Sequence, residues 1–183
     1  MKNLILDVDG VMVDLITPLL ERYNKIYDTD FKYSDIKDYN LRNTLQYFNQ
    51  VFLDDYDLYF NLKFLDDRIP EILLELKEKY NIYIVTSLPL RCSKAVAGRL
   101  AFFEENLLIQ SSNFENLIFS QYKNIITKHS FQTVIVDDCI ETLEKSVLVL
   151  DKQIVFNQPW NQEEKMFTRV NNWKELYQEL MEY

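Results

Sequence analysis

Apolar residues in this chain occur either in short continuous runs or in longer segments where they recur every three or four positions. Continuous runs predict strands that are buried on both faces, as in a parallel sheet. They cover residues 3–8, 82–86, 133–137 and 153–156, with a weaker fifth at 117–119. Helical spacing lies between them, at residues 70–80, 93–103, 122–128, 141–145 and 172–181. Strands that alternate with helices predict an α/β fold with helices on both faces of a parallel sheet.

The segment between the first strand and Pro70 does not follow this rhythm. Residues 23–64 hold 12 of the 26 aromatic residues, and several of these lie four positions apart, as on one helix face. We therefore expect a small helical cap at residues 15–67, inserted between residues 1–14 and 68–183 of an α/β core. Most of the rings are expected to form the core of this cap, and a few to offer a stacking surface to a planar ligand.

Composition narrows the chemistry. The chain has 183 residues, which suits one globular unit with a small insertion. Its two glycines, Gly10 and Gly98, cannot form a P-loop or a GxGxxG dinucleotide motif, and the single His129 excludes an HExxH metal site. Catalysis here must therefore rest on carboxylates, hydroxyls and lysines.

Charge and cysteine content bear on partners and location. The chain has 29 acidic against 20 basic residues, so we expect no binding to polymeric nucleic acid or to anionic membranes. A small phosphate ester is still allowed where cations or a metal gather locally. Cys92 and Cys139 form no CxxC motif, and no apolar run is long enough to cross a membrane. These features predict a cytoplasmic protein with reduced thiols.

The strongest chemical signal is the sequence Asp7-Val8-Asp9-Gly10 at the end of the first predicted strand. Side chains two positions apart in a strand share a face, so both carboxylates should point the same way. Open α/β sheets bind ligands at this carboxyl edge. Two buried acids side by side require a compensating cation or partial protonation, so the motif implies either a divalent metal site or a proton-sharing role. An ordinary Asp-rich exit from a strand is the simpler alternative for this motif taken alone.

Two further predicted strands end in polar residues. Thr86 and Ser87 follow one of them, Asp137 and Asp138 end another, and Lys123 precedes the latter. If these strand ends converge, they assemble a set suited to phosphoryl transfer. A carboxylate can attack phosphorus, Mg²⁺ prefers carboxylate oxygens, and lysine and hydroxyl groups can hold the phosphoryl oxygens.

Residues 79–103 form a basic segment without a single acid. Arg91 and Lys94 lie just after the Thr86-Ser87 strand end, where the start of a helix also favours anions. We expect Lys94, ahead of Arg91, to face phosphate. A solvated basic helix face is the alternative.

The ordered motifs resemble those of the haloacid dehalogenase (HAD) superfamily, and more narrowly the 5′(3′)-deoxyribonucleotidase family. The resemblance is carried by LDVDGVMVD with a following RYN, by IVTSLP, by VIVDD and by the tail FNQPWN…RVNNW, and it is weak through residues 28–67. It implies a HAD-type Rossmann-like parallel sheet with a helical cap after the first strand. It also implies Mg²⁺ and the removal of phosphate from (deoxy)nucleoside monophosphates through an aspartyl-phosphate.

The resemblance assigns roles to the predicted site residues. Asp7 would be the nucleophile and Asp9 the general acid/base, with the Asp9 backbone carbonyl also facing the metal. Asp137 and Asp138 would complete the metal site, and we expect Asp137 to coordinate and Asp138 to support it. Phosphate would be held by Thr86, Ser87 and Lys123, and the base by cap aromatics, of which we nominate Phe60 and Phe64.

Some features depart from the family pattern and leave alternatives open. Relatives often have a proline and an asparagine after the acidic pair, whereas here the residues are Cys139 to Thr142, and the inserted segment has no tryptophan. A HAD phosphatase for another small phosphate ester and an inactive nucleotide-binding homologue are the alternatives. A phosphoacceptor signalling domain is disfavoured because its acidic pair comes first in the chain. Oligomeric state is left open, a homodimer included.

Overall fold

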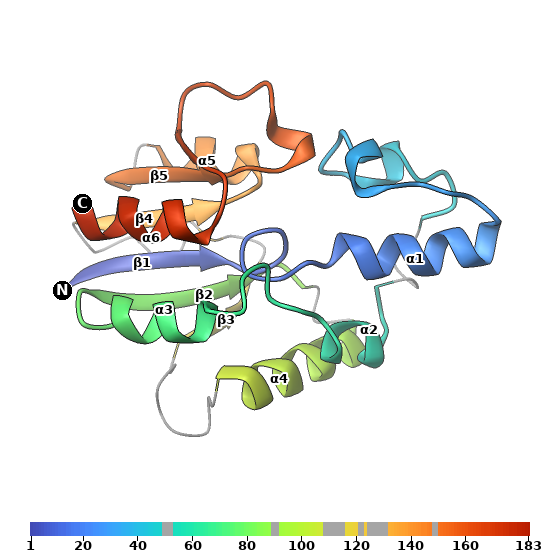
Figure 1. The fold of residues 1–183 in the computed structure, drawn as a ribbon, viewed down its shortest axis with the longest axis horizontal. Helices are drawn as coiled ribbons and strands as arrows, with labels where there is room; N and C mark the ends of the chain where they lie inside the picture. Colours follow the sequence, from blue (N-terminus) through green and yellow to red (C-terminus); the bar gives the residue numbers. More distant parts are fainter. Residues whose placement is uncertain (49–52, 89–91, 108–115, 121–122, 124–131, 148–149) are drawn as a thin grey trace.

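Six parallel strands form the central sheet of the computed structural model (Figure 1), which describes residues 1–48, 53–88, 92–107, 116–120, 123, 132–147 and 150–183. The sheet order is β3-β2-β1-β4-β5-β6. The strands are β1 (Lys2–Asp7), β2 (Tyr80–Thr86), β3 (Leu117–Phe119), β4 (Thr133–Asp137), β5 (Lys152–Phe156) and β6 (Thr168–Val170). The five predicted strands are confirmed, and β6 was not predicted.

Both faces of the sheet are covered, as the continuous apolar runs predicted. Leu4 and Leu6 of β1 join the large hydrophobic cluster on one face, whereas Ile5 belongs to the cluster on the other. The large cluster is completed by α3 (Ile69–Leu76), α4 (Ser93–Leu107) and α6 (Trp173–Glu182). On the opposite face, α5 (Ile140–Ser146) contributes Leu143. The predicted helix at 122–128 lies outside the described residues, apart from Lys123.

The inserted segment has two parts. Helix α1 (Ile16–Tyr27) extends away from the sheet, and two 3₁₀ turns (Tyr33–Asp35 and Leu41–Asn43) follow it (Figure 1). This part has a small hydrophobic core of its own. Helix α2 (Tyr56–Phe60) instead packs beside α4 and adds Tyr59 to the large cluster. The helical segment after β1 is thus confirmed, and its treatment as a separate cap subdomain over 15–67 stays a prediction.

Two simpler expectations can also be compared with the structure. Cys92 and Cys139 are free thiols and both are buried. Among the described residues, none of the helices has the length and the apolar character that a membrane crossing needs.

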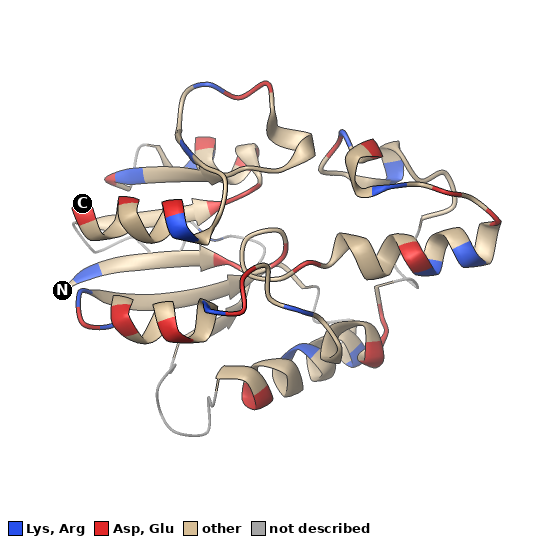
Figure 2. Cartoon of the chain, viewed as in Figure 1, with Lys and Arg blue, Asp and Glu red and all other residues tan. Residues whose placement is uncertain are grey.

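Acidic residues follow the carboxyl ends of β1 and β4 near the middle of the molecule, as Figure 2 shows. This edge of the sheet is where the predicted site residues meet.

Candidate active site

A tight turn after β1 presents the first two acids. The backbone N–H groups of Met12 and Val13 both donate to the carbonyl of Val8, at 2.8 and 3.0 Å. Gly10 has a φ of +80°, and a Cβ at this position would lie 2.2 Å from Asp138 Oδ2. Glycine is therefore required here, both for the backbone conformation and for the close approach of Asp138.

Three carboxylates and one lysine converge beneath this turn. Asp7, Asp137 and Asp138 each offer an oxygen within 4.8 Å of the others, and all three side chains are buried. Lys123 bridges two of them, with its Nζ 2.6 Å from Asp7 Oδ1 and 2.7 Å from Asp137 Oδ2. The predicted convergence of strand ends is confirmed for these four residues.

The cluster holds more negative charge than its lysine neutralises. Burial raises the pKa of Asp7 to about 7, with Asp137 and Asp9 adding to the rise and Lys123 opposing it. Burial, followed by the charges of Asp7 and Asp137, also raises the pKa of Asp138 well above its ordinary value. Burial alone would lower the pKa of Lys123, but Asp137 and Asp7 raise it, so the lysine stays charged. Such a group is chemically suited to a divalent cation.

The hydrogen bonds distinguish the two acids at the end of β4. Both oxygens of Asp137 are already engaged, one by Lys123 and the other by the backbone N–H of Cys139 at 2.9 Å. By contrast, Asp138 Oδ1 is buried and has no partner among the described residues. Asp138 is therefore the acid with an oxygen to spare, and the expected coordination of a metal by Asp137 stays a prediction.

Asp9 lies at the edge of this cluster and has a cationic partner of its own. Its side chain is 29% exposed and forms an ion pair with Nη2 of Arg99, whose side chain is completely buried. Sequence reasoning missed Arg99, although a signal was present. The arginine lies on the same face of α4 as Ala95, Phe102 and Phe103, all of them buried, and a cation there needs a buried partner.

The structure places the predicted hydroxyl and basic residues near the end of β2 in different environments. Thr86 is fully buried at the end of the strand, and its Oγ1 has no partner in the part of the chain that is described. Ser87 lines the cavity described below. Lys94 is exposed at the start of α4, so a contact of its side chain with phosphate stays a prediction. Arg91 lies outside the described residues.

Two backbone N–H groups at the start of α4 already have a carboxylate partner. The backbone N–H groups of Lys94 and Ala95 point at Asp54 Oδ1, at 3.0 and 3.4 Å. The chain thus supplies its own carboxylate to this helix terminus. The expected attraction of a bound anion to this helix start stays a prediction.

A cavity of about 370 Å³ opens beside Asp9 and Asp138. Its wall contains four aromatic residues, which are Tyr39, Phe48, Tyr59 and Trp160. The nominated Phe60 and Phe64 are not among the residues that line this cavity, and their contact with a base stays a prediction. Phe60 stacks on Tyr56 with ring centroids 5.6 Å apart, and Phe64 packs against Phe102 at 5.1 Å. In the short helix α2, Tyr59 faces the cavity and its neighbour Phe60 therefore points elsewhere.

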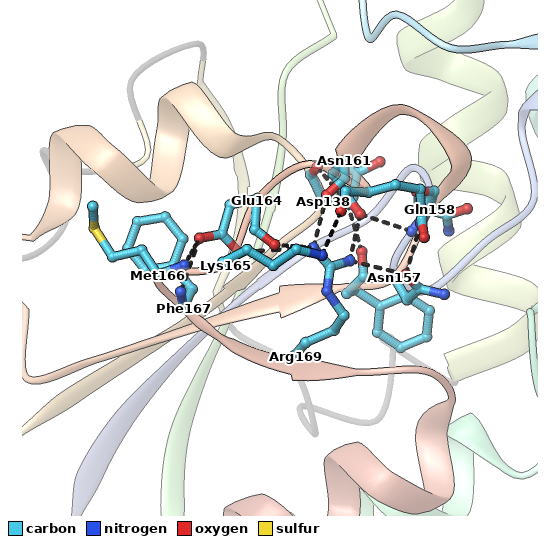
Figure 3. Close-up of polar contacts among 11 residues, drawn as sticks. Asp138, Asn157, Gln158, Asn161, Glu164, Lys165, Met166, Phe167 and Arg169 are labelled. Carbon is cyan, nitrogen blue, oxygen red and sulfur yellow. Dashed lines mark hydrogen bonds and ion pairs between the residues drawn. The ribbon is translucent and has the colours of Figure 1, made fainter.

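A polar network formed by the tail holds Asp138 and Gly10 in place, and Figure 3 shows its contacts around Asp138, Asn161 and Arg169. The side-chain amide of Asn161 donates to the Asp138 carbonyl at 3.0 Å, and Arg169 Nη1 in turn donates to Asn161 Oδ1 at 2.8 Å. The side-chain amide of Gln158 donates to the Gly10 carbonyl at 2.5 Å. The tail motif that contributed to the family resemblance therefore holds two loops of the site in place.

The same tail contacts the inserted segment. The Tyr33 hydroxyl donates to Gln158 Oε1 at 2.6 Å, and the rings of Tyr33 and Trp160 lie 5.9 Å apart. Trp160 also packs against the hydrophobic cluster around α1. The cavity is thus enclosed by residues that lie far apart in the sequence.

Known proteins resemble this chain along its whole length. A profile of the family described as 5′ nucleotidase, deoxy (pyrimidine), cytosolic type C matches residues 2–182. A 5′(3′)-deoxyribonucleotidase of Bacillus subtilis (strain 168) is 29% identical over 182 residues, or 98% of this chain and 99% of the relative. These matches cover both the predicted motifs and the segment in which the resemblance was weak.

Solved structures show the same fold. A haloacid dehalogenase-like hydrolase from Streptococcus pneumoniae has a TM-score of 0.63 at 13% identity, covering 100% of this chain and 98% of the other. A HAD family enzyme from Bacteroides thetaiotaomicron, in complex with magnesium and inorganic phosphate, has a TM-score of 0.56 at 15% identity and covers 96% and 98%. The predicted HAD-type α/β fold is thereby confirmed.

Proposed function

The chain belongs to the 5′ nucleotidase, deoxy (pyrimidine), cytosolic type C family, and from this premise we propose that it is a Mg²⁺-dependent phosphatase of deoxyribonucleoside monophosphates. One observation carries the proposal: the buried carboxylates of Asp7, Asp137 and Asp138 cluster at the edge of a cavity with aromatic walls, and one lysine, Lys123, bridges Asp7 and Asp137. The acids supply the chemistry of phosphoryl transfer, and the cavity has room for a nucleoside. A cytoplasmic location is part of the proposal and agrees with the two free thiols.

Asp7 is the proposed nucleophile. Its carboxylate attacks phosphorus and the bond to the leaving oxygen breaks, which leaves an aspartyl-phosphate that water then hydrolyses. Lys123 holds Asp7 Oδ1 at 2.6 Å and so orients the other oxygen. In this proposal, hydroxyl hydrogen bonds to the phosphoryl oxygens come from Thr86, whose buried Oγ1 has no partner among the described residues, and from Ser87, which lines the cavity.

Asp9 is the proposed general acid/base. Its carboxyl group gives a proton to the leaving nucleoside oxygen, and the resulting carboxylate takes a proton from the attacking water in the second step. Partial exposure on the cavity side allows it to reach both. Asp7 and Asp9 thus divide the attack and the proton transfers between them.

The residues present fit a divalent cation. Asp138 has a buried oxygen without a partner among the described residues, and the pKa of Asp7 and that of Asp138 are both raised by burial and by crowding of negative charge. Asp7, Asp138 and the backbone carbonyl of Asp9 would hold Mg²⁺, with Asp137 as their support. When bound, the ion supplies charge neutralisation and polarises the phosphoryl oxygens.

The cavity supports a nucleoside as the leaving group. Tyr39, Phe48 and Trp160 offer flat apolar surfaces to a base, the fully buried Tyr59 completes the wall behind them, and Asn40 is a polar neighbour among the lining residues. Residues 15–67, which provide three of these four rings, act in this proposal as the cap that selects the substrate.

The proposal is tested by measuring phosphate release from a substrate panel. Purified protein is assayed with deoxyribonucleoside and ribonucleoside monophosphates, carrying phosphate at the 5′ or the 3′ position, and with sugar phosphates. We expect hydrolysis of deoxyribonucleotides in preference to the others, loss of activity in EDTA and its return with Mg²⁺. Preference for a sugar phosphate would indicate a HAD phosphatase of another specificity, and no hydrolysis at all would indicate an inactive homologue.

A further inference from the structure

Arg99 is a completely buried cation in the described part of the chain, and it is poorly satisfied. Its side chain has no exposed surface, and Asp9 accepts from Nη2. The Nε and Nη1 groups are buried and have no hydrogen-bond partner among the described residues. Burying an arginine with one edge unsatisfied costs stability. Its placement is therefore better explained by its effect on Asp9 than by a contribution to folding.

The Arg99 side chain is also held in position by the packing of α4 against α2. Gly98, the preceding residue, lies against the backbone of α2, where an added Cβ would be 2.3 Å from the Tyr56 carbonyl oxygen. This close approach of α4 to α2 brings the Tyr59 ring over the guanidinium, 5.0 Å from its central carbon. The guanidinium is thus fixed by a ring from α2 and by the carboxylate of Asp9.

We propose that Arg99 is a positioning residue that makes Asp9 an effective proton donor to the leaving oxygen; this inference rests on the proposed function. The ion pair engages Asp9 Oδ1 and leaves Oδ2 for the transferred proton. As the O–H bond of Asp9 breaks, the proton joins the leaving oxygen, which keeps the electron pair of its bond to phosphorus. The negative charge that develops on Asp9 then lies against the guanidinium, which keeps all its protons.

This role predicts a dependence on the leaving group. A nucleoside alkoxide is strongly basic and needs a proton as it departs, whereas p-nitrophenolate leaves without one. Replacing Arg99 by Met removes the donor and the charge while keeping an unbranched chain of similar length. We expect R99M to lower kcat/KM for a deoxyribonucleoside monophosphate by about 10- to 100-fold, a fraction of the range for general acid catalysis. For p-nitrophenyl phosphate we expect a loss of less than about threefold.

The conservative variant R99K and a control complete the experiment. R99K keeps a positive charge and should lose less than R99M on the nucleotide. Arg68, which pairs with Asp66 on the surface, provides the control, and R68M should leave the ratio between the two substrates unchanged. Equal losses on both substrates, or an unchanged rate on the nucleotide, would show that Arg99 is merely structural and would overturn the proposal.

Two further readouts keep the outcomes separate. If R99M does not fold, as judged by circular dichroism, R99K alone decides: a loss confined to the nucleotide supports the role, and an equal loss on both substrates refutes it. The wild-type rate on nucleotides tests the proposed function, whereas the change in the substrate ratio tests Arg99. The two proposals can therefore fail independently.

Discussion

Replacing Asp7 by Asn should abolish turnover and, in the absence of metal, stabilise the fold. Burial and the charges of Asp137 and Asp9 hold the pKa of Asp7 at about 7, against an ordinary value of 3.8. At 1.36 kcal/mol per pKa unit, this difference corresponds to about 4 kcal/mol of destabilisation once Asp7 is ionised in both states. Asparagine has nearly the same shape and no charge, so it removes this penalty. Because Lys123 loses one of its partners, we expect a gain between about 1 and 4 kcal/mol at pH 8.

The sign and the pH window of this effect follow from proton linkage. Below about pH 4, Asp7 is protonated in the folded and in the unfolded chain, so its charge contributes nothing. Between about pH 4 and 7, the unfolded chain has released this proton while the folded chain retains it, and the wild-type free energy of unfolding falls as the pH rises. The advantage of Asp7→Asn should therefore grow from near zero at pH 4 to a plateau above pH 7.

Urea unfolding in EDTA at pH 4, 5, 6, 7 and 8 measures this directly. Asp67→Asn, at an exposed aspartate, serves as the control and should show no comparable advantage. Adding Mg²⁺ at pH 8 should stabilise the wild type and leave the Asp7 variant nearly unchanged. An advantage that is independent of pH, or a variant less stable than the wild type at pH 8, would refute the crowded-carboxylate reasoning.

Three further substitutions test the surroundings of the site. Gly10→Ala places a Cβ 2.2 Å from Asp138 Oδ2, at a residue whose φ is +80°. We expect kcat, measured by phosphate release, to fall by about 100-fold because Asp138 must move. A near wild-type kcat would contradict this prediction. Asn161→Leu removes the donor to the Asp138 carbonyl, so the Mg²⁺ concentration for half-maximal activity should rise about tenfold, and an unchanged metal titration would count against this. Trp160→Leu should raise KM for the nucleotide about tenfold by removing a stacking surface, whereas Phe60→Leu, outside the cavity wall, should not; equal effects would argue against this wall.

The strand ends were predictable from the sequence because their signals are local. Buried parallel strands have an unmistakable apolar pattern, and Asp7, Thr86 and Asp137 each end one. Since parallel strands present their carboxyl ends at one edge, the acids had to meet there. Strand β6 gave no such signal, because Val170 is the one buried residue among its three.

The rest of the site depends on packing between distant segments. Helix α2 has five residues, too few for sequence periodicity to show which ring faces the cavity, and Tyr59 was therefore missed in favour of Phe60. The role of Arg99 could not be predicted because its partner Asp9 lies 90 positions away in the sequence. The roles of Gln158 and Asn161 likewise appear only when the tail packs against the turn at Gly10.

The balance of acidic and basic side chains in the site explains why it suits a divalent ion. Four carboxylates, those of Asp7, Asp9, Asp137 and Asp138, face two buried cations, Lys123 and Arg99. The two unbalanced negative charges equal the charge of one divalent ion, and Asp138, which has a buried oxygen without a partner among the described residues, lies in the cluster with Asp7 and Asp137. The two cations therefore separate the acids by chemical role, because Lys123 holds the acids of attack and metal binding, whereas Arg99 keeps the proton donor apart from them. The charge of Asp9 already adds to the rise in the pKa of Asp7, and a contact of Asp9 with Lys123 would also leave Asp7 with less of the positive charge that opposes this rise, so the nucleophile would be harder to ionise.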